Sequence, residues 1–433
     1  MAMAPLARTD AADDDAGASA PGELRWFVFA LFFIFGGITS LNDVLIPKLK
    51  GLFDLSYAEA MLIQSAFFAA YFFISFPAAA IVRRAGYMRT AAIGLLVMTA
   101  GCLLFVPAAK TGLFITFLLA LFVLGAGITI VQVVANPLIS MLGAPKTASS
   151  RLTFAQGFNS LGTTLFPHFG AILILGSLAT VDPTTLSAAA QAAYRATEAS
   201  VIGNAYVGIA IALVVIAAVV FLRRNALVEQ KAEGGGLRAA IGLLRRPRFA
   251  FGTLGIFLYV GAEVSVGSVI VNYLMRADTL GLTESAAGTH IPYYWGGAMI
   301  GRFIGAALLR YAAPAKVLAG ACLCVLLLLA TSATTTGLVS AWSLLAIGLF
   351  NSVMFPTIFS LASERLGVRT PEGSGLICMA IVGGAIVPPL TGLAADGFGL
   401  KGALLVPALC YAIILCFGLY ARRPAPPLDP AMI

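Results

Sequence analysis

The sequence predicts an all-α membrane protein of twelve transmembrane helices in two pseudo-symmetric six-helix bundles. Three observations support this fold class. Of the 433 residues, 60% are hydrophobic and only 11% are charged, whereas soluble domains carry about 25% charged residues. The apolar runs reach the length of about 20 residues that a helical span requires. Certain proline, glycine and amide positions also recur at a nearly constant offset between the two halves.

The apolar runs account for most of the chain. A soluble fold could not bury this much apolar surface, so much of it must face lipid. The predicted spans are residues 25–47, 58–82, 90–109, 112–142, 152–178, 200–222, 249–275, 285–309, 315–333, 337–362, 372–395 and 402–421. We therefore expect a disordered tail over 1–22, a bundle over 23–222, a linker over 223–248, a second bundle over 249–421 and a tail over 422–433.

The distribution of basic residues predicts the orientation in the membrane. Twelve spans place both termini on the same side. If that side is the cytoplasm, 20 of the 27 Lys and Arg residues lie in cytoplasmic segments, six lie in external loops and Arg302 lies within a span. Because basic loops stay on the cytoplasmic side, we expect both termini inside. The net charge of +8 then reflects topology, and we expect no nucleic-acid partner.

One pattern recurs in the fourth and tenth spans. Each has an amide five residues before a proline, as Gln132 with Pro137 and Asn351 with Pro356, at an offset of 219. Proline removes a backbone donor and bends a helix. These spans are therefore expected to be bendable helices that line a cavity.

A second pattern recurs in the fifth and eleventh spans. Gly162 stands five residues before Pro167, and Gly383 stands five residues before Pro388, at an offset of 221. The two offsets nearly agree and fall in corresponding spans. We therefore predict an internal repeat, with two related bundles that rock against each other.

Two carboxylates are expected at membrane depth, where a charge is costly unless it is paired or hydrated. Asp43 lies about 27 Å along the first helix. It is read as a cation or proton site, or more simply as an acid that snorkels toward the lysines that follow it. Glu263 lies near the middle of the seventh span and could exchange a proton near neutral pH, or it could be a neutral structural group. We predict both as coupling residues, and we expect Glu198 and Glu364 at wet span ends.

Amide side chains within the spans form the candidate substrate site. Lipid cannot satisfy their donors and acceptors, so they should point inward as ligands or as links between helices. Gln132 and Asn136 share a helix face, as do Gln156 and Asn159. Many neutral hydrogen-bonding groups, without a cluster of inward cations, favour a polyol. The predicted ligands are Asn42, Gln64, Gln132, Asn136, Gln156, Asn159, Tyr259, Asn272, Trp295 and Asn351.

Aromatic residues near these amides could stack on a pyranose ring. Tyr259, Tyr294 and Trp295 are the candidates, while Tyr293 is better suited to the membrane interface. Arg302, between Gly301 and Gly305, is predicted to be structural or gating. The same role is predicted for the repeated residues Pro137, Pro356, Gly162, Pro167, Gly383 and Pro388.

Cofactor chemistry finds no support in the sequence. The chain has only two His residues, and its six Cys residues stand in apolar runs without metal-ligand spacing. It contains no nucleotide-binding loop. We therefore expect a protein that is not an enzyme, holds neither metal nor cofactor, and is not driven by ATP.

Four strings carry a family resemblance that covers about residues 25–420. They are Phe35-Gly-Gly-Ile-Thr-Ser-Leu-Asn-Asp-Val-Leu-Ile-Pro47, Gln132-Val-Val-Ala-Asn-Pro137, Phe154-Ala-Gln-Gly-Phe-Asn-Ser-Leu-Gly162 and Phe355-Pro-Thr-Ile-Phe-Ser360. The chain resembles the fucose permease type of the major facilitator superfamily, and more closely its bacterial glucose/galactose porter branch. The resemblance implies a hexose carrier that works by alternating access.

The resemblance also implies roles for single residues. The Asp of the Leu-Asn-Asp string, here Asp43, is a functional carboxylate, and the amides Gln156 and Asn159 help to line the sugar site. Fucose permeases carry a Glu where this chain has Gln132, which cannot titrate, so a proton relay from the fourth span is not available. Conversely, Glu263 stands where the fucose permease pattern has an amide.

We predict a secondary active transporter that imports a hexose, with glucose or galactose favoured, across a bacterial inner membrane. Coupling would use H⁺ or Na⁺ through Asp43 and Glu263, or be absent. The alternatives are a fucose or other sugar porter, an efflux carrier for small lipophilic compounds, and a non-transporting sensor or scaffold. Efflux predicts a largely apolar cavity, which the inward amides contradict. The expected partners are the hexose, the ion and membrane lipids, and the protein is expected to be a monomer.

Overall fold

The computed structural model describes residues 22–53, 57–170, 187–225 and 237–425. This described part of the chain is helical and contains no strand, which confirms the predicted all-α class. Some helical residues within it have side chains that are not described, and Asn42, Asp43 and Gln64 are among them. The predictions for these three side chains therefore lie outside the described residues.

The helices follow the predicted spans. They are α1 (Gly22–Phe53), α2 (Tyr57–Ala85), α3 (Tyr87–Thr111), α4 (Phe114–Met141), η1 (Pro145–Thr147), α5 (Ala148–Gly170), α6 (Ala188–Leu222), α7 (Leu237–Leu243), α8 (Pro247–Met275), α9 (Glu284–Gly288), α10 (Ile291–Leu308), α11 (Pro314–Thr334), α12 (Gly337–Asn351), α13 (Met354–Ala362), η4 (Gly367–Arg369), α14 (Thr370–Met379), η5 (Ala380–Val382), α15 (Gly383–Ala403) and α16 (Leu405–Tyr420). Counting only described residues, nine helical stretches are long and apolar enough to cross a membrane. The three remaining predicted spans correspond to α5, α10 and α16.

Two of the predicted spans are broken. The tenth consists of α12 and α13, which meet at Ser352 and Val353, and Pro356 lies in the first turn of α13. A helix breaks ahead of a proline because the ring lacks an N–H and clashes with the preceding turn. The eleventh consists of α14 and α15, joined by η5. In contrast, α4 and α5 run unbroken through Pro137 and Pro167.

Several helix boundaries differ from those predicted. The sixth span begins at Ala188 instead of residue 200, because a strongly helix-forming Ala-rich stretch precedes its apolar run. Glu198, expected at a wet end, is consequently buried in this helix. The eighth span begins only at Ile291, after the separate turn α9, and the short helix α7 lies in the predicted linker. Residues 171–178 of the fifth predicted span lie outside the described residues, and the bundle boundaries stay predictions.

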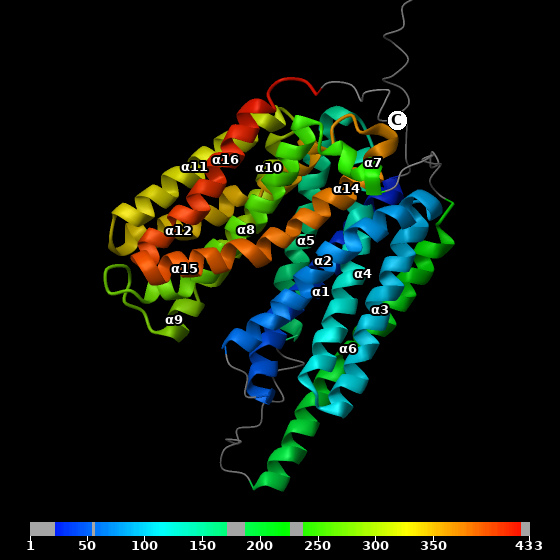
Figure 1. The fold of residues 1–433 in the computed structure, drawn as a ribbon, viewed down its shortest axis with the longest axis vertical. Helices are drawn as coiled ribbons and strands as arrows, with labels where there is room; N and C mark the ends of the chain where they lie inside the picture. Colours follow the sequence, from blue (N-terminus) through cyan, green and yellow to red (C-terminus); the bar gives the residue numbers. More distant parts are fainter. Residues whose placement is uncertain (1–21, 54–56, 171–186, 226–236, 426–433) are drawn as a thin grey trace, which may run out of the picture.

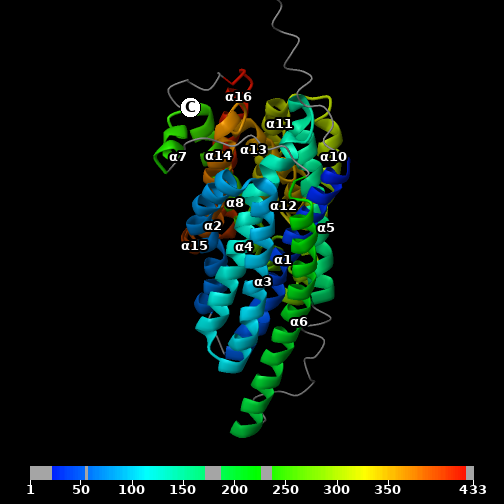
Figure 2. The same cartoon turned by 90° about the vertical axis from the view of Figure 1, so that its right-hand side faces the viewer.

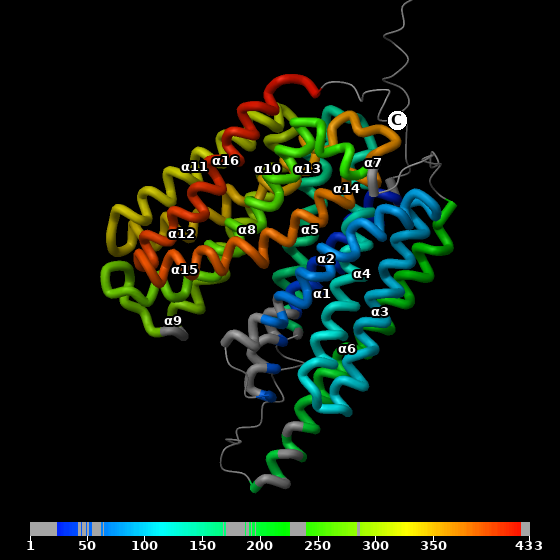
Figure 3. The backbone as a smooth tube through the Cα atoms, in the orientation of Figure 1, coloured from blue at the N-terminus to red at the C-terminus, as the bar shows by residue number. Residues whose placement is uncertain are grey.

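The helices form two arms. Helices α1 to α6 make one arm and α8 to α16 make the other, and the arms meet beside α7 and diverge away from it (Figure 1, Figure 2). We call the meeting end the linker end and the opposite end the far end. Helices α13 and α14 lie beside α5 and α7 at the linker end (Figure 3).

Contacts between the arms are made by a few helices. Helix α5 packs against α10 and α13, while α2 and α4 pack against α14. Inside each arm, α1 packs on α5 and α8 packs on α15. These two pairs join the first and fifth spans of one half, and the seventh and eleventh of the other. The same pairing therefore occurs in both halves.

The repeated glycines explain this matched packing. A Cβ atom on Gly162 would lie 2.1 Å from the carbonyl oxygen of Phe33, and one on Gly383 would lie 2.0 Å from the carbonyl oxygen of Phe257. Each glycine thus lets the backbones of two helices approach within a distance that any side chain would prevent. The sequence repeat has a direct packing reason at this position.

We expect the substitution Gly383→Ala to destabilise the protein, because the methyl group has to displace backbone. Overpacking of this kind costs about 1–3 kcal/mol, which should lower the melting temperature by several degrees. Gly392→Ala is the matched control, since it lies on the same helix and a Cβ there meets nothing within 4 Å. Thermal unfolding of both variants in detergent checks this, and equal melting temperatures would contradict it.

Candidate functional site

A buried chain of hydrogen bonds surrounds Glu263 in the second arm. The hydroxyl oxygen of Tyr259 lies 2.7 Å from Oε1 of Glu263 and 3.0 Å from the backbone carbonyl oxygen of Asn351. Tyr259 and Glu263 stand one turn apart on α8, so they share a helix face. Asn351 is the last residue of α12. The chain therefore runs from a carboxyl group to the point where the tenth span breaks.

The break explains why the carbonyl of Asn351 needs a partner from another helix. The last carbonyls of a helix have no intrahelical donor, and Pro356 prevents the next turn from continuing regularly. The hydroxyl of Tyr259 satisfies this orphan carbonyl. The amide-x4-proline pattern of the sequence thus corresponds, in the second arm, to a helix end that a tyrosine on α8 caps.

A second tyrosine completes the cluster. The side-chain amide of Asn351 donates to the hydroxyl of Tyr294 on α10 over 3.0 Å, and that hydroxyl lies 3.4 Å from the carbonyl oxygen of Glu263. Asn351, Tyr259 and Tyr294 are at most 1% exposed, whereas Glu263 is half-buried. Sequence analysis predicted three of these four residues as site residues and gave Tyr294 only as an aromatic platform.

Arg302 connects this cluster to the other arm. Its Nη1 donates to the backbone carbonyl of Gln156 over 3.2 Å and to the hydroxyl of Ser160, both on α5. Its Nε is buried and has no hydrogen-bond partner. A single guanidinium on α10 therefore joins the two arms.

The amides of the first arm bond to neighbouring helices. Gln132 on α4 donates to the hydroxyl of Tyr71 on α2 over 3.0 Å. Asn159 on α5 donates to the carbonyl of Phe32 on α1 over 3.3 Å, and Gly36 makes room for it. In this conformation both amides link helices, which is the alternative that the sequence left open beside a ligand role.

Asn136 lies in the seam between the arms. It is fully buried and lies beside Cys378 of α14. Ser374, also on α14, donates to the carbonyl of Val133 over 2.9 Å. A ligand cannot reach Asn136 while these helices are in contact, so its predicted ligand role requires another conformation.

Two predicted ligands lie nearer the far end and are exposed. Trp295 is 44% exposed, and a Cβ on Gly267 would lie 3.4 Å from its Cζ2. Because Gly267 follows Glu263 by one turn of α8, the indole lies one turn from the carboxyl group. Asn272 is exposed farther along α8. Trp295, but not Asn272, is therefore close to the cluster.

Ion pairing between the arms occurs at the linker end. Arg83 on α2 donates to Oε1 of Glu372 on α14 over 2.8 Å, and Arg369 lies 3.6 Å from the same oxygen. Glu372 is only 1% exposed. Sequence analysis missed this acid, although its place at the start of the eleventh predicted span was the available signal. The linker end is thus closed by a buried ion pair.

Serine hydroxyls add to this closure. Ser149 and Ser360 are hydrogen-bonded over 2.5 Å, and Ser150 donates to the carbonyl of Ala306 over 2.6 Å. Both serines lie in the first turn of α5, whereas their partners belong to α13 and α10. Small polar residues let helices approach closely and bond across the contact.

The sequence profile of the Major Facilitator Superfamily matches residues 27–381. The glucose/galactose transporter of Brucella abortus (strain 2308) is 48% identical over 393 residues, which cover 91% of this chain and 92% of that protein. The L-fucose-proton symporter of Escherichia coli (strain K12) is 33% identical, over 96% of this chain and 97% of the symporter.

Solved structures agree with these relatives. The crystal structure of the E. coli fucose:proton symporter FucP superposes with a TM-score of 0.84 at 31% identity, over 93% of this chain and 99% of that one. A structure of FucP in the outward conformation gives a TM-score of 0.85, also at 31% identity, over 94% of this chain and 100% of that one. The architecture of two six-helix halves is therefore shared along nearly the whole chain.

We expect Arg83→Gln to weaken the closure of the linker end, because the variant removes a charge-assisted hydrogen bond to a buried carboxylate. Such bonds contribute about 1.5–3 kcal/mol, so the population of open molecules should rise roughly tenfold. Spin labels at Ala144 and Val368, both exposed at the linker end, report this opening as longer distances.

Arg84→Gln is the matched control for this experiment. Arg84 is adjacent in sequence but exposed, and it has the same charge. Its replacement should leave the distance distribution of the wild type unchanged. If both arginine variants give that distribution, the ion pair of Arg83 with Glu372 does not hold the linker end closed.

Proposed function

This chain belongs to the Major Facilitator Superfamily, and we propose that it is a secondary active transporter that imports a hexose together with an ion. Glucose and galactose are the favoured cargo. The support is the 48% identity to a glucose/galactose transporter along almost the full length of both chains. The proposal of coupled transport rests on the half-buried, hydrogen-bonded carboxyl group of Glu263 in the middle of a membrane span.

The proposed orientation places the linker end in the cytoplasm of a bacterium, with the transporter in the inner membrane. The excess of Lys and Arg in the segments of this end supports it. The contacts between the arms lie at this end, so the described conformation opens outward in that orientation. The similarity to FucP in its outward conformation is consistent with this assignment.

The proposed coupling device depends on the single proton of the Tyr259 hydroxyl. Two acceptors, Glu263 and the carbonyl of Asn351, lie within hydrogen-bond distance of it. When Glu263 is protonated, it donates to Tyr259, and Tyr259 donates to Asn351. When Glu263 is ionised, Tyr259 donates to the carboxylate and the carbonyl of Asn351 loses its partner. The proton on Glu263 thereby stabilises the helix break.

In the proposed mechanism, the protonation state of Glu263 also affects the other arm, through Arg302. An ionised Glu263 attracts its guanidinium and competes with the acceptors that hold it on α5, Gln156 and Ser160. A protonated Glu263 leaves Arg302 in place across the seam. Coupling on this scheme needs no titratable group at Gln132, which bonds to Tyr71. Asp43 stays a second proposed coupling residue on the basis of its sequence string.

The proposed sugar site lies on the far-end side of Glu263. Trp295 provides an exposed aromatic face one turn from the carboxyl group. The amides of α5, Gln156 and Asn159, are the proposed sugar ligands from the other arm, on the basis of their sequence string. The remaining predicted ligands, Asn42, Gln64, Gln132, Asn136, Asn272 and Asn351, stay proposals for other steps of the cycle.

We expect Glu263→Gln to abolish accumulation of labelled glucose or galactose while it retains exchange across the membrane, because a neutral group cannot carry the ion. Proteoliposomes with an imposed pH gradient or Na⁺ gradient measure both properties. Asp396→Asn, which changes an exposed carboxylate of α15, is the control and should accumulate sugar. Accumulation by Glu263→Gln would exclude its coupling role, and accumulation driven by Na⁺ alone would exclude the proton.

We expect Tyr259→Phe to slow coupled uptake roughly tenfold, because Glu263 and the carbonyl of Asn351 then lose their shared hydroxyl. An unsatisfied buried polar group costs about 1–3 kcal/mol. Tyr311→Phe removes a hydroxyl from a residue that is 90% exposed and should transport as the wild type does. Equal uptake rates for the two tyrosine variants would contradict the proposed device.

A further inference from the structure

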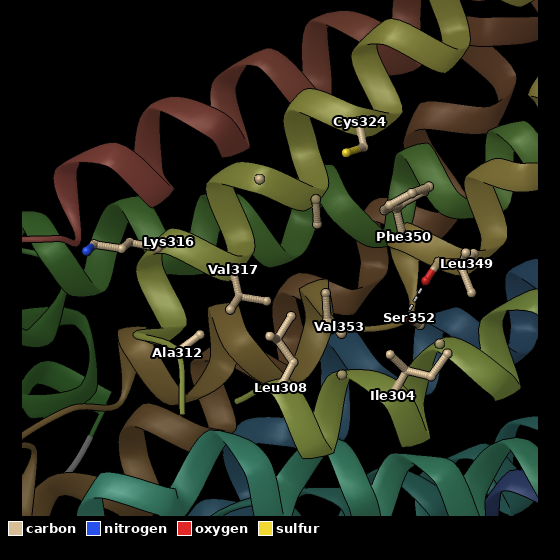
Figure 4. A pocket seen from close by; sticks show the side chains of 14 residues that line it. Ile304, Leu308, Ala312, Lys316, Val317, Cys324, Leu349, Phe350, Ser352 and Val353 are labelled. Carbon is tan, nitrogen blue, oxygen red and sulfur yellow. Dashed lines mark hydrogen bonds between the residues drawn. The ribbon is translucent and has the colours of Figure 1, made fainter. Parts of the chain in front are cut away.

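A cavity of about 450 Å³ lies in the second arm, between α10, α11 and the break that separates α12 from α13. Figure 4 shows Lys316 at one end of this groove, with Leu308, Val317 and Val353 along it and Cys324 toward the other end. It lies outside the cluster of Glu263, and its walls are almost entirely apolar. The volume is in the range of small-molecule sites.

Glycines on two helices create the groove. Gly301 and Gly305 hold α10 against its neighbours, because a Cβ atom would lie 2.3 Å from the carbonyl oxygen of Leu349 and 2.1 Å from Cγ1 of Val353, respectively. Gly320 on α11 is different, since a Cβ there meets nothing within 4 Å. Helix α11 therefore stands away from α10 at this level, and a glycine leaves the space open.

The surface around the groove faces lipid. Ile304 is 58% exposed, Leu308 is 49% exposed and Leu323 is 51% exposed. Apolar cavities stay dry, so water is a poor occupant. In a membrane, hydrocarbon is the medium in contact with these side chains. An acyl chain is therefore the occupant that the walls of the groove favour.

Basic residues at the opening of the groove favour a lipid with an anionic headgroup. Lys316 lies in the first turn of α11, and Arg310 and Tyr311 lie in the preceding turn at the linker end, all three exposed. Tyr with Lys or Arg is typical of the membrane interface, and basic pockets between spans bind anionic lipid headgroups. From Lys316 to Cys324 the groove extends along about 12 Å of helix.

We propose that this groove binds an anionic phospholipid, with one acyl chain along α11 and its phosphate at Lys316. The chain lies against Ser352 and Val353, on the residues that follow Asn351 at the helix break. It also contacts Gly301, the neighbour of Arg302. The bound lipid thereby supports the part of α10 that holds Arg302 on α5. This inference depends on the protein spanning a membrane and is independent of its cargo.

Native mass spectrometry of the full-length protein tests the proposal by titration with phosphatidylglycerol or phosphatidylcholine. The variant Gly320→Leu fills the groove without a backbone clash, and Gly208→Leu is its control, because a Cβ at this exposed glycine of α6 also meets nothing within 4 Å. Lys316→Gln removes the charge at the opening of the groove, and Lys146→Gln removes an exposed lysine of η1.

Gly320→Leu should lose one tightly bound phosphatidylglycerol, while Gly208→Leu keeps it. Lys316→Gln should bind phosphatidylglycerol about fivefold more weakly and phosphatidylcholine as the wild type does, while Lys146→Gln changes neither. The proposal is overturned if phosphatidylcholine binds the wild type as tightly, if Gly320→Leu retains the lipid, or if a dimer that Gly320→Leu disperses occupies this face.

Discussion

The hydroxyl of Tyr259 has one proton but two acceptors within hydrogen-bond distance, and the proposed coupling depends on the competition between these acceptors. The carboxyl group of Glu263 lies at membrane depth, where it needs a hydrogen-bonding partner, and the carbonyl of Asn351 needs one because its helix ends there. Only a protonated Glu263 satisfies both. In the proposed mechanism, a proton on Glu263 therefore decides whether the carbonyl at the helix break keeps its hydrogen bond, and Arg302 extends the effect to the opposite arm.

The two arms share their scaffold and differ in their polar chemistry. Gly162 and Gly383 allow the same close helix contact in each arm, so the repeat is one of backbone packing. The amide-x4-proline pattern has different consequences, since α4 runs straight through Pro137 while the tenth span breaks before Pro356. The break occurs in the arm that carries Glu263, so the second arm holds both the proposed coupling residue and the broken helix.

Most of the fold was predictable, because apolar runs of membrane length and repeated glycines leave few alternatives. Glu263, Tyr259 and Asn351 were also predictable individually, because a polar side chain in a membrane span is costly unless it is hydrogen-bonded or has a function. Which of these residues bond to one another could not be predicted, because it depends on which helices pack together. Glu372 was overlooked because its partner Arg83 lies 289 positions away in the sequence. The start of α6 was misplaced because alanine favours a helix but adds little to the hydropathy by which the spans were predicted.

Because the proposed transporter carries its hexose and its ion together, Glu263 is expected to be protonated when sugar binds, and infrared difference spectroscopy tests this directly. Addition of glucose or galactose to the reconstituted wild type should produce the carbonyl band of a protonated carboxyl group. That band should be absent from Glu263→Gln, shifted in Tyr259→Phe and retained in Asp396→Asn. A wild-type spectrum without this band, or an unchanged band in Glu263→Gln, would contradict the account.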